Sequence, residues 1–211
     1  MKVVVIGCTH AGTSAVKTIL KENPSVEISV FERNDNVSFL SCGIAMYVGG
    51  VVKDPAGLFY SNPEELTQLG ANIKMEHNVK SIDTVAKKVV VENINTGEVF
   101  EETYDKLVNT TGSWPFCPPT PGNEKKNVLL CKNYNQAEEV IKQNLTAKKV
   151  VIVGGGYIGI ELVEAFEQSG KEVTLIEKGH IAGTCLNEGC MVICALTDVT
   201  KFIESNNRFN H

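Results

Sequence analysis

The chain has 211 residues, of which 43% are hydrophobic and 21% charged, and its formal net charge is −5. This length suits one large or two small domains, and the composition is typical of globular proteins. The negative charge and the lack of a basic stripe exclude nucleic acid as an expected partner. No apolar run is long enough for a bilayer, so we expect no membrane association.

The seven cysteines are irregularly spaced and odd in number, unlike a secreted disulfide framework. Met1-Lys2 leads directly into an apolar run with no signal peptide before it. We therefore expect a cytoplasmic protein.

The N-terminal third alternates strands and helices, the pattern of an α/β fold. Val3–Ile6 is an unbroken β-branched run that predicts a strand buried on both faces. A helical apolar stripe follows over Thr13–Lys21, and Val26–Phe31 predicts a second strand. We expect a short helix over Ser41–Val48, ended by the two glycines after it.

Cap and turn residues organise the middle of the chain. Asn62 suits the N-cap, and Pro63 the first position, of a further helix. Asn95-Thr96-Gly97 predicts a hairpin between Lys87–Val91 and Glu98–Thr103.

Strand, proline and helix signals lead to the second half. Tyr104–Val108 predicts another core strand, and four prolines over Pro115–Pro121 mark a crossing between domains. Asn135–Gln143 predicts a helix.

The second half repeats the order strand, glycine turn, helix and strand. The two strands are expected at Lys149–Val153 and Glu172–Ile176, with the helix Ile158–Gln168 between them. Apolar residues at helical spacing over Met191–Ile203 predict a last helix, and Ser205–His211 a frayed polar end.

Two glycine turns occupy equivalent places in the two halves. A glycine at a strand end allows a tight turn, and a second near the helix start admits phosphate to free N–H groups. Gly7 and Gly12 fit these roles first, although Thr9 replaces the middle glycine. The complete G-x-G-x-x-G motif follows in the second half, at Gly154, Gly156 and Gly159.

A carboxylate stands about 20 residues after each turn, where it can bind ribose hydroxyls. These residues are Glu32 and Glu177. Glu177 would repel a 2′-phosphate, which favours NADH over NADPH. The alternatives are a plain α/β crossover turn in the first half and a solvated strand-end charge at Glu177.

Cys42 stands alone at the start of the predicted short helix. The positive end of a helix dipole favours a thiolate there. The alternative is that Cys42 is an inert small hydrophobe, as most isolated cysteines are.

Several motifs resemble the NADH oxidase and NADH peroxidase family of FAD-dependent pyridine nucleotide-disulphide oxidoreductases, over roughly residues 1–178. The matching segments are Val5–Thr13, Ser38–Gly43, Val52–Pro55, Gly57–Tyr60, Tyr104–Val108, Thr110–Pro115 and Gly155–Glu161. The first and sixth of these segments are most similar to water-forming NADH oxidases.

The resemblance implies FAD on the first turn and NADH on the second. The FAD-binding residues it implies are Gly7, Thr9, His10, Ala11, Gly12, Glu32, Arg33, Cys42, Val79, Thr110, Thr111, Gly112, Ser113 and Lys132. The NAD-binding residues it implies are Gly154, Gly156, Tyr157, Ile158, Gly159 and Glu177.

It further implies that NADH reduces O₂ to water, with Cys42 as the redox cysteine and His10 as the active-site histidine. Cys42 would pass through sulfenic acid, His10 would polarise peroxide or steady the charge on sulfur, and Tyr157 would move aside for nicotinamide. The alternatives are an NADH peroxidase, a coenzyme A-disulfide reductase, or a truncated or recombined nucleotide-binding fragment without activity.

The tail differs from that family. Gly183–Met191 is similar to the redox-disulfide segment of dihydrolipoamide dehydrogenases, which makes Cys185 and Cys190 a candidate second redox pair. Two structural thiols are the alternative, and we expect no metal site because the spacing is wrong for zinc.

We expect two Rossmann-like units in an α/β chain that is incomplete at its C-terminus, because the family's returning FAD segment and dimer-forming interface domain do not follow. A homodimer or larger assembly, which the family implies, is therefore not expected of this chain by itself. The expected parts are an FAD-binding domain over 1–115, a linker and helix over 116–148, the start of an NAD-binding domain over 149–180 and an atypical tail over 181–211.

Overall fold

The computed structural model describes the backbone of residues 1–209, and all side chains in that range except those of 185, 186, 188, 190–193 and 204–209. Contacts divide the chain into two compact units. Unit 1 comprises Met1–Ser41, Asp54–Glu124 and Lys132–Tyr134. Unit 2 comprises Cys42–Lys53, Lys125–Cys131 and Asn135–His211.

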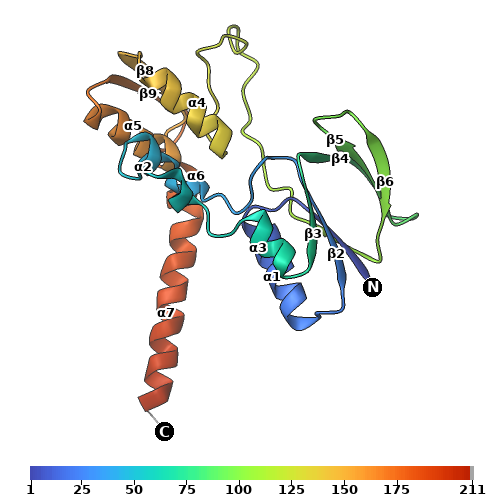
Figure 1. The fold of residues 1–211 in the computed structure, drawn as a ribbon. Coiled ribbons are helices and arrows are strands. Elements are labelled where there is room, and N and C mark those ends of the chain that lie inside the picture. The colour runs from blue at the N-terminus through green and yellow to red at the C-terminus, as the bar shows by residue number, and fades with distance from the viewer. Residues whose placement is uncertain (210–211) are drawn as a thin grey trace. The chain divides into compact units, whose positions relative to one another are not determined.

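Unit 1 is built on a four-stranded parallel sheet of order β3-β2-β1-β7, of which Figure 1 labels β2 and β3. Its strands are β1 (Lys2–Ile6), β2 (Glu27–Glu32), β3 (Ala71–Met75) and β7 (Lys106–Asn109). β1 lies between β2 and β7, with Val4 opposite both Ser29 and Leu107. The predicted parallel α/β architecture is confirmed, and β3 is a strand that the sequence did not reveal.

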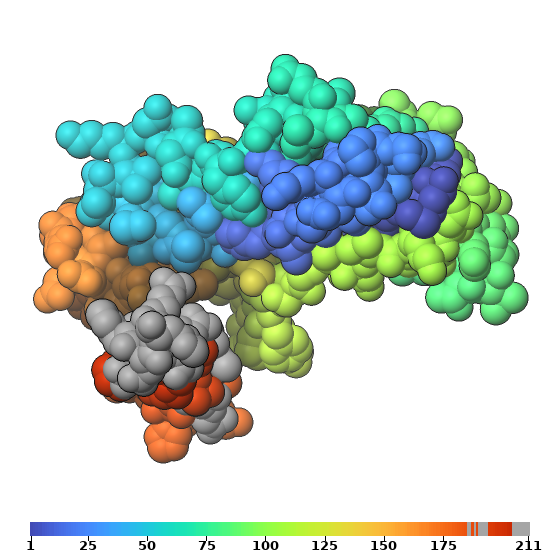
Figure 2. All heavy atoms as spheres, turned by 90° about the horizontal axis from the view of Figure 1, so that it is seen from below, coloured from blue at the N-terminus to red at the C-terminus, as the bar shows by residue number. Residues whose placement is uncertain are grey.

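Two helices cover one face of this sheet. The helices α1 (His10–Glu22) and α3 (Pro63–Gln68) lie side by side (Figure 1, Figure 2) and are joined by an ion pair of 2.7 Å between Lys17 and Glu65. Val3 and Val5 of β1 join the same buried cluster as Val16, Leu20 and Leu66 of these helices.

A three-stranded antiparallel sheet covers the other face. It consists of β4 (His77–Asp83), β5 (Lys88–Asn93) and β6 (Val99–Thr103). Val4 and Ile6 of β1 are buried in one cluster with Val89 and Val91 of β5. Alternate residues of β1 therefore enter opposite layers, which explains its continuous apolar run and confirms its predicted burial on both faces. The β5–β6 hairpin is also as predicted.

Unit 2 contains the second strand–helix–strand segment. Strands β8 (Lys149–Val153) and β9 (Glu172–Ile176) pair in parallel, and α5 (Tyr157–Gln168) connects them. Its other helices are α2 (Ile44–Val48), α4 (Tyr134–Asn144), α6 (Gly183–Glu188) and α7 (Cys190–Phe209). The repeated strand–turn–helix–strand order is confirmed. Of the described helices, none combines the length and apolar character that a membrane span requires.

Two predicted elements differ in the structure. The helix expected over Ser41–Val48 is a 3₁₀ turn, η1 (Ser41–Gly43), followed by the short α2, so Cys42 lies in the turn. We expected a frayed end from Ser205 onward. This prediction is wrong up to Phe209, because α7 continues to that residue. Strand β4, another short 3₁₀ helix, η2 (Pro55–Leu58), and α6 were not predicted either.

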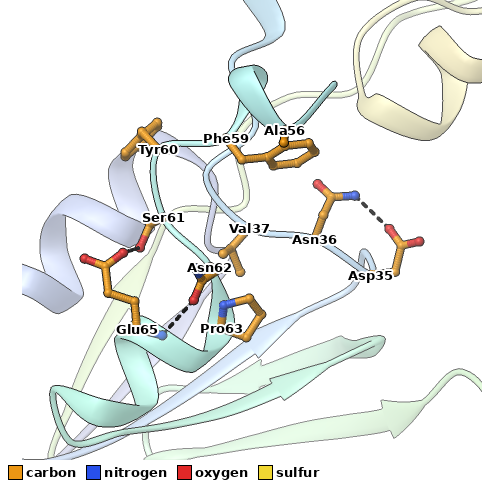
Figure 3. Close-up of a pocket in the computed structure, with 10 residues that line it drawn as sticks. All are labelled: Asp35, Asn36, Val37, Ala56, Phe59, Tyr60, Ser61, Asn62, Pro63 and Glu65. Carbon is orange, nitrogen blue, oxygen red and sulfur yellow. Dashed lines mark hydrogen bonds between the residues drawn. The ribbon is translucent and has the colours of Figure 1, made fainter. Parts of the chain in front are cut away.

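The cap of α3 is as the sequence predicts (Figure 3). The Asn62 side chain accepts a hydrogen bond of 2.7 Å from the Glu65 N–H, and Pro63 is the first helical residue. The helix places Leu66, which is fully buried, in the core of unit 1. A cap that satisfies the first turn therefore holds α3 against the sheet.

We expect Asn62→Ala to lower the free energy of unfolding of unit 1 by about 1 kcal/mol, because the Glu65 N–H loses its acceptor. Urea denaturation followed by fluorescence of Trp114, the single tryptophan, reports on this unit. Asn62→Asp retains the acceptor and is the control. An unchanged midpoint in the alanine variant would contradict the role of the cap.

Candidate functional site

The first glycine turn is closed by backbone contacts. Gly7 adopts a φ of +87°, and its N–H donates to the Phe31 carbonyl at 2.9 Å. A Cβ on Gly12 would lie 1.9 Å from the Gly7 oxygen, and a Cβ on Gly7 would lie 2.5 Å from the Thr110 oxygen. Gly12 is needed because the start of α1 approaches the end of β1 at backbone distance, and Gly7 because its φ is positive and the backbone at the end of β7 lies against it.

The predicted segment Thr110–Ser113 is fixed to this turn. The Thr110 hydroxyl lies 2.8 Å from the Ile6 carbonyl and 2.9 Å from the Gly7 carbonyl, and can donate to either. The next three residues are exposed, and Gly112 has a φ of +67° with no atom within 4 Å of an added Cβ. The end of β7 thus presents an open backbone turn beside the start of α1.

A buried carboxylate stands at the end of β2. Glu32 is 2% exposed and accepts a hydrogen bond of 2.6 Å from the Cys8 N–H, the first amide after Gly7. The Asn34 N–H and side-chain amide donate to its other oxygen at 2.8 and 2.6 Å. The turn and the following strand are therefore locked together by one acid.

The second turn repeats this arrangement. Glu177, just after β9, accepts a hydrogen bond of 2.6 Å from the Gly155 N–H, the first amide after Gly154, and another of 2.6 Å from the Gly179 N–H. These two N–H groups hold the pKa of Glu177 below its ordinary value, and the Gly179 N–H has the larger effect. The stabilisation they provide is present at neutral pH and is lost as pH falls through that lowered pKa.

Both helices that follow the turns begin without a side-chain cap. Thr9 at the N-cap of α1 and Gly156 at the N-cap of α5 make no side-chain capping hydrogen bond. The first N–H groups of such helices suit an anion such as a phosphate. In the second turn, an added Cβ on Gly154 or Gly156 would meet no atom within 4 Å, so there is room for a ligand.

A cavity of about 210 Å³ adjoins the second carboxylate. It is lined by Glu177, Gly179, His180, Gly183, Thr184 and Asn187. Among these residues, only Glu177 was predicted to bind a ligand, while Gly183, Thr184 and Asn187 belong to the tail segment that resembles a redox-disulfide segment. The available signal was position, because loops at the carboxyl ends of parallel strands line ligand sites in such folds.

The residues predicted to act in redox chemistry, and the tyrosine predicted to move aside for nicotinamide, are found in different units. His10 is the exposed first residue of α1 in unit 1, whereas Cys42 is an exposed residue of unit 2. Tyr157, the first residue of α5, is 51% exposed. The joint action of His10 and Cys42 is therefore a proposal.

The remaining predicted residues of unit 1 lie on separate elements. The Arg33 guanidinium stands 4.8 Å from the centroid of the Trp114 ring, a cation–π contact. Val79 is in β4 at a bulge and packs against the cluster of β1 and β5. Lys132 is in the segment Lys132–Tyr134, while the side chains of Cys185 and Cys190 lie outside the described residues.

A second cavity, of about 490 Å³, is open to solvent and lies between loops, η2 and α3 of unit 1 (Figure 3). It is lined by Asp35, Asn36, Val37, Ala56, Phe59, Tyr60, Ser61, Asn62, Pro63 and Glu65. None of the residues predicted to bind FAD or NAD is among them. Lys17 and the Ser61 hydroxyl hold the pKa of Glu65 at its edge below the ordinary value.

The chain is similar in sequence to known proteins. A family model described as pyridine nucleotide-disulphide oxidoreductase matches residues 1–196. An NADH oxidase of Enterococcus faecalis is 65% identical over 177 residues, which cover 84% of this chain and 40% of the relative. A coenzyme A disulfide reductase of Staphylococcus haemolyticus is 28% identical over 183 residues, which cover 85% of this chain and 41% of the relative.

A solved structure extends the comparison. The water-forming NADH oxidase from Lactobacillus brevis, bound to NADH, is 53% identical with a TM-score of 0.84, covering 86% of this chain and 41% of that one. The chain thus spans about 40% of the length of the curated relatives it matches.

Cys8, inside the first turn, contrasts with Cys42. Cys8 is fully buried, and burial raises the pKa of its thiol from 9.0 to about 11. Because the folded pKa is the higher one, the stabilisation from burying the neutral thiol is complete below pH 9.0 and is lost as pH rises through about 11.

We expect iodoacetamide at pH about 8 to alkylate the exposed Cys42 and leave Cys8 unmodified, since the thiolate is the reactive form. Peptide mass spectrometry checks both sites in one sample. The same reaction in urea, where Cys8 becomes accessible, is the control. Modification of Cys8 in the folded chain as fast as Cys42 would contradict its burial.

Proposed function

The chain belongs to the pyridine nucleotide-disulphide oxidoreductase family, and from this premise we propose that it is part of an FAD-dependent NADH oxidase that reduces O₂ to water. The observation that carries the proposal is the doubled turn, in which a glutamate accepts a hydrogen bond from the first amide after each glycine. The 65% identity to an NADH oxidase supports the reaction class.

Unit 1 fits FAD by its chemistry. The uncapped start of α1, which comprises Thr9, His10, Ala11 and Gly12, offers N–H groups to a pyrophosphate, and Glu32 suits the adenosine ribose. Arg33, Val79, Thr110–Ser113 and Lys132 complete the proposed contacts. When bound, FAD supplies a carrier of two electrons between NADH and oxygen.

Unit 2 fits NADH. Gly154, Gly156 and Gly159 shape the turn, while Ile158 and Tyr157 stand at the start of α5. The exposed Tyr157 ring can turn away to admit a nicotinamide. Glu177 presents a carboxylate where a 2′-phosphate would be repelled and a 2′-hydroxyl bound.

Cys42 and His10 carry the proposed chemistry on oxygen. The Cys42 thiolate attacks one oxygen of hydrogen peroxide, so that an S–O bond forms and the O–O bond breaks. Sulfur loses two electrons to become sulfenic acid, and the leaving hydroxide takes a proton to become water. His10 supplies or holds that proton. A second NADH, with a proton, then reduces the sulfenic acid: the S–O bond breaks, the oxygen leaves as water and the thiol is restored.

The setting of the reaction is also proposed. We infer a reducing cytoplasm, since a thiol that cycles through sulfenic acid requires reductant to be at hand. We further propose that the chain acts within a homodimer or larger assembly together with the remaining length found in its relatives.

We expect Glu177→Gln to raise the affinity for NADPH relative to NADH on the order of tenfold, because a negative charge near the 2′-phosphate is removed. Titration of the chain with each nucleotide, followed by nucleotide fluorescence, measures the ratio. Glu172→Gln, at the start of β9, removes an equal charge and is the matched control. An unchanged ratio in Glu177→Gln would leave the carboxylate without a role in selectivity.

We expect Cys42→Ser to convert the product from water to hydrogen peroxide. Consumption should then fall from two NADH per O₂ to one, since peroxide is no longer reduced at sulfur. An oxygen electrode with a peroxide assay, applied to the FAD-loaded chain, makes the measurement.

The products also separate the alternatives. Turnover with hydrogen peroxide but not O₂ would indicate a peroxidase, and turnover with coenzyme A disulfide would indicate a disulfide reductase. Unchanged products in Cys42→Ser would refute the sulfenic acid step. A colourless chain that consumes no NADH would indicate a nucleotide-binding fragment without activity.

A further inference from the structure

The His10 ring is stacked on a tyrosine fifty residues away in the sequence. The centroids of His10 and Tyr60 are 5.7 Å apart, and the ring planes differ by 10°. Both residues belong to unit 1. An offset stack at this distance stabilises one orientation of the imidazole plane.

The Tyr60 hydroxyl also favours a proton on one of the two ring nitrogens of His10. It donates to the Thr9 carbonyl at 3.3 Å, and its oxygen lies 3.4 Å from Nδ1 of His10. A phenol has one hydrogen, and a carbonyl can only accept. If that hydrogen points to Thr9, the phenol oxygen faces Nδ1 with a lone pair, so Nδ1 must carry a proton to complete the pair.

Hydrogen bonds of the neighbouring Ser61 hold Tyr60 in place. The next residue, Ser61, donates its N–H to the Ser38 hydroxyl at 2.9 Å, and that hydroxyl donates to the Ser61 carbonyl at 2.6 Å. The Ser38 N–H donates to the Cys8 carbonyl at 2.9 Å. Ser38 is fully buried at a φ of +60°, a conformation that surrounding contacts must maintain. This chain of bonds ties Tyr60 to the same turn that positions His10.

We propose that Tyr60 is a positioning residue that holds neutral His10 as its Nδ1–H tautomer, which leaves Nε2 to exchange a proton with the reacting group. The role of Nε2 rests on the proposed function. There, Nε2 takes up the proton released when the thiol ionises and returns a proton to the hydroxide that leaves the peroxide. Both contacts of the hydroxyl are longer than ordinary hydrogen bonds, so they do not anchor the loop, which the Ser38 bonds hold instead.

Nitrogen NMR of the ¹⁵N-histidine chain with FAD, at pH about 8, distinguishes the tautomers of a neutral imidazole. His77 is an internal standard, because its Nδ1 lies 2.7 Å from the Met75 carbonyl and must be protonated. His10→Gln assigns the His10 signals. We expect wild-type His10 to match His77, and Tyr60→Phe to shift His10 towards Nε2–H while its ring stack is kept.

Tyr104→Phe is the matched control, because it removes a hydroxyl that also donates to a carbonyl at 3.3 Å, that of Asp83. Its His10 signals should stay unchanged. An Nε2–H tautomer in the wild type, or the same tautomer in wild type and Tyr60→Phe, would overturn the proposal. Unchanged His77 signals verify that Tyr60→Phe remains folded.

The formation of sulfenic acid on Cys42 by added peroxide, measured by a trapping reagent, provides the second readout. Tyr60→Phe should slow it roughly tenfold. A shifted tautomer with an unchanged rate would overturn the role given to Nε2. If neither protein forms sulfenic acid, the proposed function fails, while the tautomer measurement still decides the role of Tyr60.

Discussion

One hydrogen bond, made twice, sets the geometry of both glycine turns. The first amide after the opening glycine donates to a glutamate at the end of the next strand, as Cys8 does to Glu32 and Gly155 to Glu177. The bond joins two adjacent parallel strands at their carboxyl ends. It fixes the direction in which each turn leaves its strand, and so the line along which α1 or α5 begins. The direction of each helix in turn decides where its first free N–H groups point.

The layers of unit 1 make this geometry rigid. β1 is buried between the helices α1 and α3 on one face and the sheet of β4, β5 and β6 on the other. Its side chains therefore have two packed environments, and a shift along the strand would disturb both. The turn at Gly7 inherits its position from this strand, with Thr110 attached to it by the end of β7.

Local chemistry made much of this predictable. The run Val3–Ile6, the Asn62 cap and the repeated glycines each carry their reason within a few residues, and the structure agrees with them. β3 was missed because its alternation of apolar and polar residues runs over only five positions, Ala71–Met75, and its place is set by pairing with the distant β2. The stack of His10 on Tyr60 was equally hidden, since it arises from the Ser38 link between two loops. At Ser41–Val48, apolar residues predicted one helix, but the chain closes a 3₁₀ turn before the α-helical turns begin.

The two carboxylates also differ in burial, which affects how long a bound ligand stays. Glu32 is 2% exposed, whereas Glu177 is partly buried, accepts hydrogen bonds from the Gly155 and Gly179 amides and borders an open cavity. A preorganised acceptor shielded from water favours a long residence time, because little is regained when a ligand departs. A partly hydrated acceptor regains water at once and favours rapid exchange. The same turn geometry thus suits a slowly exchanging ligand in unit 1 and a rapidly exchanging ligand in unit 2.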